Sequence, residues 1–366
     1  MELSEREKHV GRMREIVERM LLDLDGGKIP SLKVPIRHAS NTNYDPDEMK
    51  LWLGGRVLER SPDNTKQVHV YSQTLSVMSE IKSAIEQGLY PSTRDVFYNL
   101  KKTISANSKL LLAEEQSETD EVIHDIEVLS GVFREQFGLT TWQAKSVIMG
   151  DLTVRDRATG KTINVKDHTL TGQGFNLPLL WDSLELVGTN ARFVLIVEKG
   201  AIFISLFLQK WWEKNGAIIM TSGGEPDRVG RRFIKRLHDE LKLPVFTVVD
   251  ADPWGWTISS VYRIGSIRLS HEGDNLACPD IQFLGMSCSD IYDYKVQDLT
   301  ARATDADLKR ASEMKDYPWF QTPFWQKEIS LFLDKKLKAE LESLNKRYTF
   351  FADKYLIDKL KSAGVI

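Results

Sequence analysis

The stretch RFVLIVEK at residues 192–199 decides the fold class, because it is an almost uninterrupted apolar strand that ends in a carboxylate. The pattern recurs in AIIMTS at 217–222 and in PVFTVVDAD at 244–252. A helical segment follows each strand: AIFISLFLQKWWEKNG at 201–216, PDRVGRRFIKRLHDELK at 226–242 and GWTISSVYRIG at 255–265. Strands that are apolar on both faces and alternate with helices are typical of a parallel sheet covered by helices on both sides. We therefore predict an α/β fold for the second half of the chain.

Acidic residues stand where two of these strands end. Glu198 ends the first strand, and Asp250 and Asp252 end the third. Ligands of an open α/β sheet bind at the carboxyl ends of its strands, and residues two apart in an extended chain point the same way. Converging carboxylates need a compensating cation, and oxygen ligands without His or Cys favour Mg²⁺. The pattern predicts a magnesium site, with ordinary loop acids or helix caps as the alternative.

A glycine-rich turn and a basic helix follow the second strand. Gly223 and Gly224 allow the backbone to approach a ligand closely, and a helix N-terminus just after them favours an anion. The helix carries Arg228, Arg231 and Arg232. These arginines either contact a DNA backbone or lie on a solvated helix face.

A segment of the first half, STRDVFYNLKK at 92–102, places a phenol among cations. A Ser or Thr at its start can cap a helix in which Tyr98 has Arg94, Lys101 and Lys102 as neighbours. A phenol has an ordinary pKa near ~10, so Tyr98 needs a cation such as Arg94 to act as a nucleophile at neutral pH. The two lysines are expected to contact phosphates. The alternative is that Tyr98 is a half-buried core aromatic.

The chain divides into four parts by composition and periodicity. An apolar stripe predicts an amphipathic helix over 1–25, and a linker rich in Pro, Asn, Asp and Gly follows it. Short helices, preceded by a short strand at 66–72, suggest a helix-turn-helix or winged-helix unit. We expect a helix with an extended arm, a winged-helix domain, a hairpin with a connecting segment, and a sheet domain with C-terminal helices, at 1–66, 67–150, 151–190 and 191–366.

Two further segments yield specific expectations. RDRATGKT at 155–162 ends like a phosphate-binding loop, but Arg155 stands where that motif needs its first glycine, and a strand rather than a helix follows. This chain therefore has no credible ATP site. Near the C-terminus, Thr322 and Pro323 are predicted to open a long helix whose apolar stripe continues to Leu344.

The composition excludes several classes of protein. The 366 residues are 42% hydrophobic and 28% charged, which is ordinary for a globular protein. Two cysteines and seven scattered histidines exclude a disulfide framework, a four-cysteine zinc site and an HExxH zinc enzyme. The formal net charge of −3 means that any DNA site is a local patch. The charged N-terminus and the lack of a long apolar run lead us to expect a cytoplasmic, nucleoid-associated protein.

Taken together, the motifs resemble one family. TRDVFY at 93–98 is similar to the active-site segment of type IIB DNA topoisomerase (topoisomerase VI) A subunits and of their meiotic relatives that form double-strand breaks, whose pattern is roughly T-x-R-x-x-Y-Y. VEKGAIF at 197–203, SGGEPDRVGRRFIKRLHDEL at 222–241 and VVDADPWGW at 248–256 resemble the Toprim domain of that family, with its lone Glu and its DxD pair. The resemblance extends from about residue 67 to the C-terminus.

The resemblance implies a fold and a reaction. A winged-helix (CAP-like) domain would carry the tyrosine, and a Toprim domain would follow it. Phe97 takes the first position of the usual Tyr-Tyr pair, which leaves Tyr98 as the nucleophile. Its attack on a DNA phosphodiester would give a 5′-phosphotyrosyl double-strand break. Arg94 would stabilise charge on the phosphate, and Mg²⁺ held by Glu198, Asp250 and Asp252 would neutralise more of it.

The implied reaction also specifies partners. Cutting both strands of double-stranded DNA needs two tyrosines, so we expect a homodimer in which Tyr98 of one protomer faces the metal site of the other. Strand passage needs ATP, which a separate ATPase B subunit would bind in an A₂B₂ assembly. The helix at 1–25 is the expected docking site for that subunit. Two alternatives remain, a recombination-initiating transesterase without relaxation activity and a non-catalytic DNA-binding scaffold.

Overall fold

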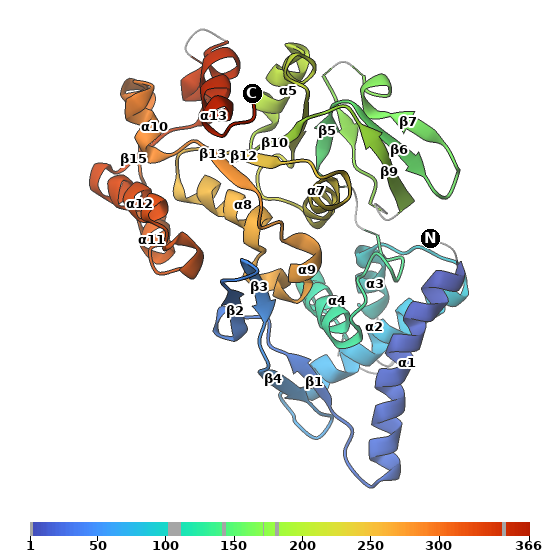
Figure 1. Cartoon of the computed structure of the whole chain (residues 1–366). Coiled ribbons are helices and arrows are strands. Elements are labelled where there is room, and N and C mark those ends of the chain that lie inside the picture. The colour runs from blue at the N-terminus through green and yellow to red at the C-terminus, as the bar shows by residue number, and fades with distance from the viewer. Residues whose placement is uncertain (1–2, 102–110, 141–143, 171, 180–182, 346–348) are drawn as a thin grey trace. The chain divides into compact units, whose positions relative to one another are not determined.

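The computed structural model describes residues 3–101, 111–140, 144–170, 172–179, 183–345 and 349–366. The chain forms two compact units (Figure 1). The first comprises Met1–Thr42 and Leu53–Gln143, and the second Asn43–Trp52 and Ala144–Ile366. Residues 43–52, expected in the arm, and residues 144–150, expected in the small domain, thus belong to the unit that contains the large sheet.

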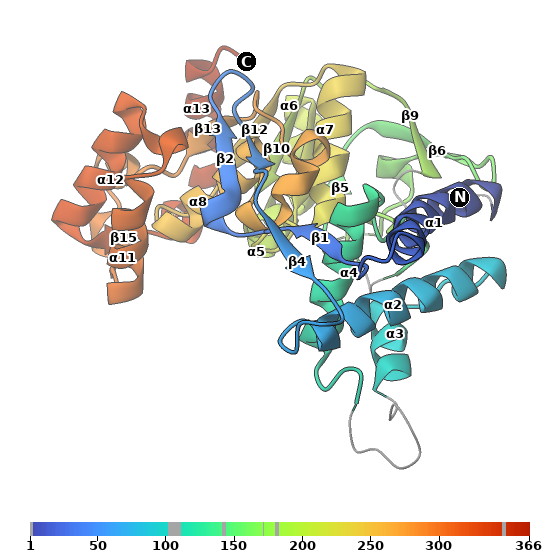
Figure 2. The same ribbon diagram turned by 90° about the horizontal axis from the view of Figure 1, so that it is seen from below.

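Four helices form the core of the first unit: α1 (Leu3–Asp25), α2 (Val68–Glu86), α3 (Thr93–Leu100) and α4 (Gln116–Ser130). Helix α2 packs against the other three (Figure 2). The core side of α1 is formed by Val10, Met13, Ile16 and Met20. The predicted N-terminal helix is confirmed, and it buries one apolar face within its own unit.

One expectation for the first unit is wrong. The segment predicted as a strand at 66–72 contains the start of α2 instead. Tyr71 is buried together with Met78 and Ile81, so its apolar spacing continues that of the helix, and the alternation of two valines was too short to indicate a strand. The expected extended arm contains two short strands, and β1 (Leu32–Pro35) pairs antiparallel with β4 (Val57–Arg60).

A six-stranded sheet with the order β13-β12-β10-β11-β5-β8 forms the centre of the second unit. Its strands are β5 (Val147–Met149), β8 (Phe175–Asn176), β10 (Phe193–Val197), β11 (Ala217–Thr221), β12 (Val245–Val248) and β13 (Gln282–Gly285). β10 pairs parallel with β11 and β12, and β12 pairs parallel with β13, whereas β5 is antiparallel to β11. The predicted parallel sheet is confirmed, with an antiparallel edge in addition.

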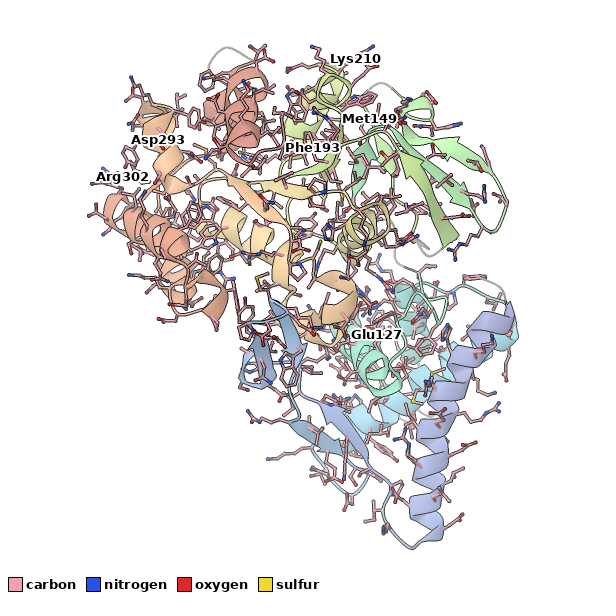
Figure 3. All side chains as sticks on the ribbon, viewed as in Figure 1. Glu127, Met149, Phe193, Lys210, Asp293 and Arg302 are labelled. Atoms are coloured by element: carbon pink, nitrogen blue, oxygen red, sulfur yellow. The ribbon has the colours of Figure 1, made fainter. Side chains whose placement is uncertain are left out.

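Both faces of this sheet are buried, as the continuous apolar strands predicted. Along β10, Phe193 and Leu195 belong to one apolar core, while Val194 and Ile196 belong to another (Figure 3 labels Phe193). The strands are connected by α5 (Gly200–Leu208), α6 (Trp211–Asn215), α7 (Arg228–Leu241) and α8 (Pro253–Ile264). The predicted helix at 201–216 is split in two at Lys210, whose φ is 53°.

The predicted hairpin after residue 150 is confirmed. β6 (Leu152–Asp156) pairs antiparallel with β7 (Thr162–Asn164) and with β9 (Leu184–Thr189). A strand therefore follows Gly160 and Lys161, and the loop has no helix N-terminus that would hold a phosphate.

The C-terminal region contains α10 (Cys288–Asp293), α11 (Asp305–Met314), α12 (Pro323–Lys335) and α13 (Leu356–Ser362). The long helix predicted from Thr322 to Leu344 ends early, because Lys336 takes a left-handed conformation with φ 53°. Strand β15 (Leu337–Lys338) and a 3₁₀ turn at Leu341–Leu344 follow. Ala339 then pairs with Ala251, which brings this segment to the carboxyl end of β12. Within the described residues, no helix is long and apolar enough to cross a membrane.

Candidate functional site

Helix α3 presents the predicted nucleophile to solvent. Ser92 caps its N-terminus by accepting a hydrogen bond from the backbone N–H of Asp95, and the Asp95 carboxylate accepts one from the Ser92 N–H in return. These bonds lower the pKa of the Asp95 carboxyl. Asp95 is therefore explained by helix capping, which fixes where α3 begins and which of its residues face outward.

The aromatic pair of α3 is divided between core and surface. Phe97 is 7% exposed and packs in the core of the first unit, whereas Tyr98 is 57% exposed. The alternative that Tyr98 is a half-buried core aromatic is therefore not what the structure shows. Arg94 is exposed and precedes Tyr98 by four residues, a spacing that makes them neighbours on one helix face.

Of the two lysines that follow Tyr98, the first lies within the described residues. Lys101 is exposed, and its Nζ lies 5.3 Å from the centroid of the Phe97 ring. Lys102 lies outside the described residues.

Glu198 is held at the carboxyl end of β10 by its own backbone. Its carbonyl oxygen accepts hydrogen bonds from Thr221 Oγ1 at 3.2 Å and from the Gly224 N–H at 2.9 Å. Gly223 and Gly224 have φ values of 64° and 116°, so this turn needs glycine. The Glu198 carboxylate accepts a hydrogen bond from the Asp250 N–H at 2.9 Å, which joins the two strand ends.

Asp250 is the most enclosed of the three carboxylates, at 6% exposed. Its Oδ1 accepts a hydrogen bond from the Leu341 N–H at 2.8 Å, and its Oδ2 lies 3.2 Å from Lys199 Nζ. Burial raises the pKa of Asp250 to about 6, against the opposing effects of these two partners. The site thus keeps a buried carboxylate next to a single ammonium group.

The pKa of Glu198 is raised further. Burial, together with the negative charges of Asp250 and Asp252, brings it to about 7. Two buried carboxyls with raised pKa values at adjacent strand ends are candidates for a functional site. Glu198 and Asp250 therefore meet, as the sequence predicted.

Asp252 caps a helix, which the sequence analysis gave only as the alternative to metal binding. Its Oδ1 accepts hydrogen bonds from the N–H groups of Trp254 at 2.9 Å and Gly255 at 2.8 Å, so it is the N-cap of α8. Burial raises its pKa, against the effect of these N–H groups. Among the described residues, the three carboxylates do not gather their oxygens within 4.8 Å of one another.

Three charged residues of this site were missed by sequence reasoning. Lys199 Nζ lies 2.9 Å from Glu340 Oε2, 2.9 Å from Glu342 Oε2 and 3.2 Å from Asp250 Oδ2. Burial lowers the pKa of Lys199, but these carboxylates outweigh it and raise the pKa overall. Lys199 directly follows Glu198 in the chain and could have been considered, whereas nothing in the sequence connects Glu340 or Glu342 with it.

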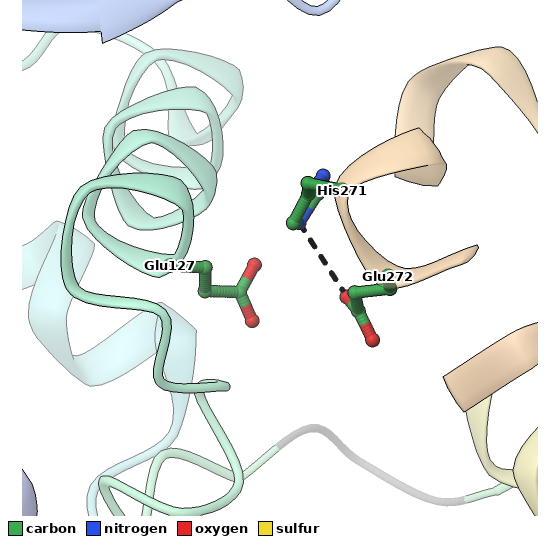
Figure 4. Close-up of side chains that lie close together, drawn as sticks. All are labelled: Glu127, His271 and Glu272. Carbon is green, nitrogen blue, oxygen red and sulfur yellow. Dashed lines mark ion pairs between the residues drawn. The ribbon is translucent and has the colours of Figure 1, made fainter. Parts of the chain in front are cut away.

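The predicted basic face of α7 is enclosed in the structure. Arg231 and Arg232 are 2% and 5% exposed. Arg228 Nη2 lies 2.5 Å from Glu272 Oε1, and His271 Nε2 lies 3.6 Å from the same oxygen (Figure 4). A fully buried Glu272 explains why cations gather here. Arg231 and Arg232 therefore do not lie on a solvated helix face, and a DNA contact by the arginines of α7 stays a prediction.

Comparisons with known proteins agree with this arrangement. Residues 193–360 match the family model for the Toprim domain of the topoisomerase 6 A subunit and Spo11, and residues 69–139 match that of type IIB DNA topoisomerase. The chain is similar to the type 2 DNA topoisomerase 6 A subunit of Hyperthermus butylicus, with 38% identity over 100% of this chain and 98% of that protein. The proteins of the same name from Sulfurisphaera tokodaii and Pyrococcus abyssi are 37% and 31% identical, over 99% and 98% of this chain and 96% of each relative.

The parallel sheet with carboxylates at its strand ends, together with the first of these matches, shows that the second unit contains a Toprim domain at residues 193–360. Because relatives above 30% identity cover essentially the whole chain, the chain belongs to the family of type IIB DNA topoisomerase 6 A subunits.

Proposed function

We propose that this chain is the DNA-cleaving and rejoining subunit of a type IIB topoisomerase, with Tyr98 as its nucleophile. The observation that carries the assignment is the division of the aromatic pair, in which Phe97 is buried and Tyr98 projects beside Arg94. An exposed phenol on a rigid, capped helix can reach a bound substrate, whereas a core tyrosine cannot.

The cleavage step is a transesterification. The Tyr98 phenolic oxygen bonds to phosphorus, and the bond from phosphorus to the 3′ oxygen breaks, so that the phenolic proton is lost and the 3′ oxygen gains one. The phosphate ends on Tyr98 at the 5′ side of the break. One ester replaces another, and the reverse reaction reseals DNA without a nucleotide. Arg94, the neighbour of Tyr98 on α3, would stabilise charge on the non-bridging oxygens.

Glu198 and Asp250 are the residues that would hold a magnesium ion. They offer only hard oxygen ligands, and burial raises the pKa values of both, so a bound cation would favour their ionised forms. A bound Mg²⁺ would supply charge neutralisation at the phosphate. Asp252 is occupied as the cap of α8, so its contribution would be through its charge or through water.

The first unit would present the tyrosine to double-stranded DNA. Helices α2, α3 and α4 are consecutive and pack on one another, which supports a helix-turn-helix or winged-helix unit with α3 and Lys101 near the phosphates. Two strands require two such tyrosines, which favours a homodimer. An ATPase B subunit in an A₂B₂ complex would bind the ATP that strand passage needs.

Covalent trapping tests the proposal. The full-length A dimer with its B subunit, ATP, Mg²⁺ and supercoiled DNA is denatured during turnover, and protein-linked DNA is counted. The Tyr98→Phe variant should lose the adduct entirely, while the Tyr90→Phe variant, which removes another exposed phenol, should retain it. Adduct in Tyr98→Phe would overturn the assignment, and no adduct in any variant would favour a DNA-binding scaffold.

Relaxation of supercoiled DNA distinguishes a topoisomerase from a recombination-initiating transesterase. A topoisomerase relaxes supercoiled DNA in the presence of ATP and its B subunit, whereas a recombination-initiating transesterase gives broken DNA that is not resealed. Closed, relaxed circles are the product that we expect.

A further inference from the structure

The ammonium group of Lys199 occupies the rim of the candidate metal site. Its Nζ is within hydrogen-bonding or ion-pairing distance of Asp250 on one side and of Glu340 and Glu342 on the other, at 3.2, 2.9 and 2.9 Å. The Lys199 side chain is 25% exposed, so it has access to solvent and room to move. One cation is thus shared between a proposed metal ligand and two acids that are not ligands.

The two glutamates are fixed in place by the backbone. The Ala251 N–H donates to the Ala339 carbonyl at 2.8 Å, and the Leu341 N–H donates to Asp250 Oδ1 at 2.8 Å. Leu341 is fully buried, so the residues on either side of it, Glu340 and Glu342, are left at the surface, where both contact Lys199. The segment that positions Asp250 therefore also provides a second, acidic binding site for the Lys199 ammonium group, formed by Glu340 and Glu342.

A divalent cation at Glu198 and Asp250 would meet Lys199 as a like charge. Two cations that share one carboxylate repel each other, and the repulsion is strong where solvent is partly excluded. Moving fully onto Glu340 and Glu342 would relieve this repulsion without leaving Lys199 unpaired. An ammonium has three donors, which suits it to such a transfer between neighbouring acceptors.

We propose that Lys199 is the resident counter-cation of Asp250, which a divalent ion must displace and which Glu340 and Glu342 then retain. It is a positioning residue. It pairs with Asp250 while the metal site is empty, and it sets the divalent concentration at which the site fills. This inference rests on the proposed function only through the metal site at Glu198 and Asp250.

The test measures Mn²⁺ affinity of the full-length protein by electron paramagnetic resonance, without DNA or turnover. Lys199→Met should bind Mn²⁺ about tenfold more tightly than the wild type, because the competitor is gone. The Glu340→Gln/Glu342→Gln double variant should bind at least about threefold more weakly, because Lys199 then stays on Asp250. In a Lys199→Met background, the two glutamine substitutions should weaken Mn²⁺ binding less than they do in the wild type, since part of their effect acts through Lys199.

A matched control removes a neighbouring cation that has another partner. Lys338 Nζ bonds to Asp307 Oδ2 at 2.8 Å, so Lys338→Met changes the local charge without freeing Asp250. Its Mn²⁺ affinity should rise much less than that of Lys199→Met. An equal rise in both variants, or no change in Lys199→Met, would overturn the inference.

Thermal melting gives a second measure that does not need high-affinity binding. In EDTA, Lys199→Met should melt below the wild type because three carboxylates lose their cation, and saturating Mg²⁺ should raise its Tm more than that of the wild type. If Lys199→Met does not fold, weaker binding by the glutamine double variant still supports the inference, and unchanged binding contradicts it.

The failure of the inference is distinguishable from failure of the proposed function. Glu198→Gln should abolish Mn²⁺ binding in every background. If it does not, the metal site itself is wrong. If it does, while the Lys199 and glutamate variants bind like the wild type, only the counter-cation role is lost.

Discussion

At the scale of single residues, Phe97 and Tyr98 are adjacent aromatic side chains with opposite roles. Phe97→Ala should destabilise the protein by about 3–5 kcal/mol, because it removes a ring from the core of the first unit. Tyr98→Phe removes an exposed hydroxyl and should change the unfolding free energy by less than about 0.5 kcal/mol, yet abolish cleavage. Urea unfolding measures the first quantity. A large stability loss in Tyr98→Phe would mean that its hydroxyl is structural.

His124 of α4 should make the stability of the protein depend on pH. Burial, with the Arg134 charge, lowers the pKa of His124 to about 3 from an ordinary 6.5. The unfolded chain therefore binds a proton that the fold does not, so stability falls as the pH drops from 6.5 towards 3. The loss should be about 2 kcal/mol at pH 5.

Comparing variants isolates this effect from that of the carboxyl groups. His124→Gln should lose that part of the decline in unfolding free energy between pH 7.5 and 5, whereas replacement of the exposed His168 by Gln should leave the decline unchanged. An equal decline in the wild type and His124→Gln would show that His124 is protonated in the fold.

Much of the candidate site could be predicted at this scale, for a physical reason. Glu198 and Asp250 directly follow strands whose apolar runs fix their direction and place in the sheet, so their meeting follows from local pattern. Lys199 contacts Glu340 and Glu342 across more than 140 positions of sequence. Long-range contacts of exposed charges have no periodicity, so the sequence did not indicate them.

At the scale of elements, Asp252 is the N-cap of α8, and we propose that its charge also contributes to the metal site. Asp252→Ala should destabilise the protein by about 1 kcal/mol, because α8 loses its N-cap. Asp252→Asn should retain that stability, since Asn is an equally good cap, but weaken divalent binding through loss of charge. Chemical denaturation and Mn²⁺ titration of both variants provide the test. Equal destabilisation by Asn and Ala would exclude the cap as the source.

Besides the apolar face that packs in the core, helix α1 has a second group of apolar residues, which are exposed. Leu21, Leu22 and Leu24 are 53%, 69% and 53% exposed. If α1 docks the B subunit, Leu21→Ser/Leu24→Ser should abolish co-purification with B but leave the A dimer intact, because the buried face of α1 is unchanged. Glu18→Ser on the same helix is the control. Undiminished co-purification of the serine double variant would remove α1 as the dock.

Two helices expected from the sequence, at 201–216 and at 322–344, are interrupted by left-handed lysines, Lys210 and Lys336, and not by a change in apolar pattern. The apolar stripe beyond Lys335 is helical in spacing, but the left-handed Lys336 stops α12 and turns the chain towards Asp250. A lysine in that conformation is not a stop signal that the sequence shows, unlike Gly131, which ends α4. The strands β10, β11 and β12 and the helices α7 and α8, which are each marked by continuous or periodic apolar residues, were predicted correctly.

At the scale of the whole molecule, cleavage should need two chains. We expect Tyr98 of one protomer to act with the metal site of its partner, so a dimer of a Tyr98→Phe chain with an Asp250→Ala chain should cut one strand. Each homodimer should be inactive. Nicked circles counted on a gel measure the result, and an inactive mixed dimer, shown to form by differential tagging, would place tyrosine and metal in the same chain.

The most direct test of the central claim is mass spectrometry of the peptide that remains on DNA after trapping and proteolysis. The account predicts one peptide, which spans Thr93–Leu100 and carries a nucleotide 5′-phosphate on Tyr98. A nucleotide on Tyr90, on a serine or on any other side chain would contradict it.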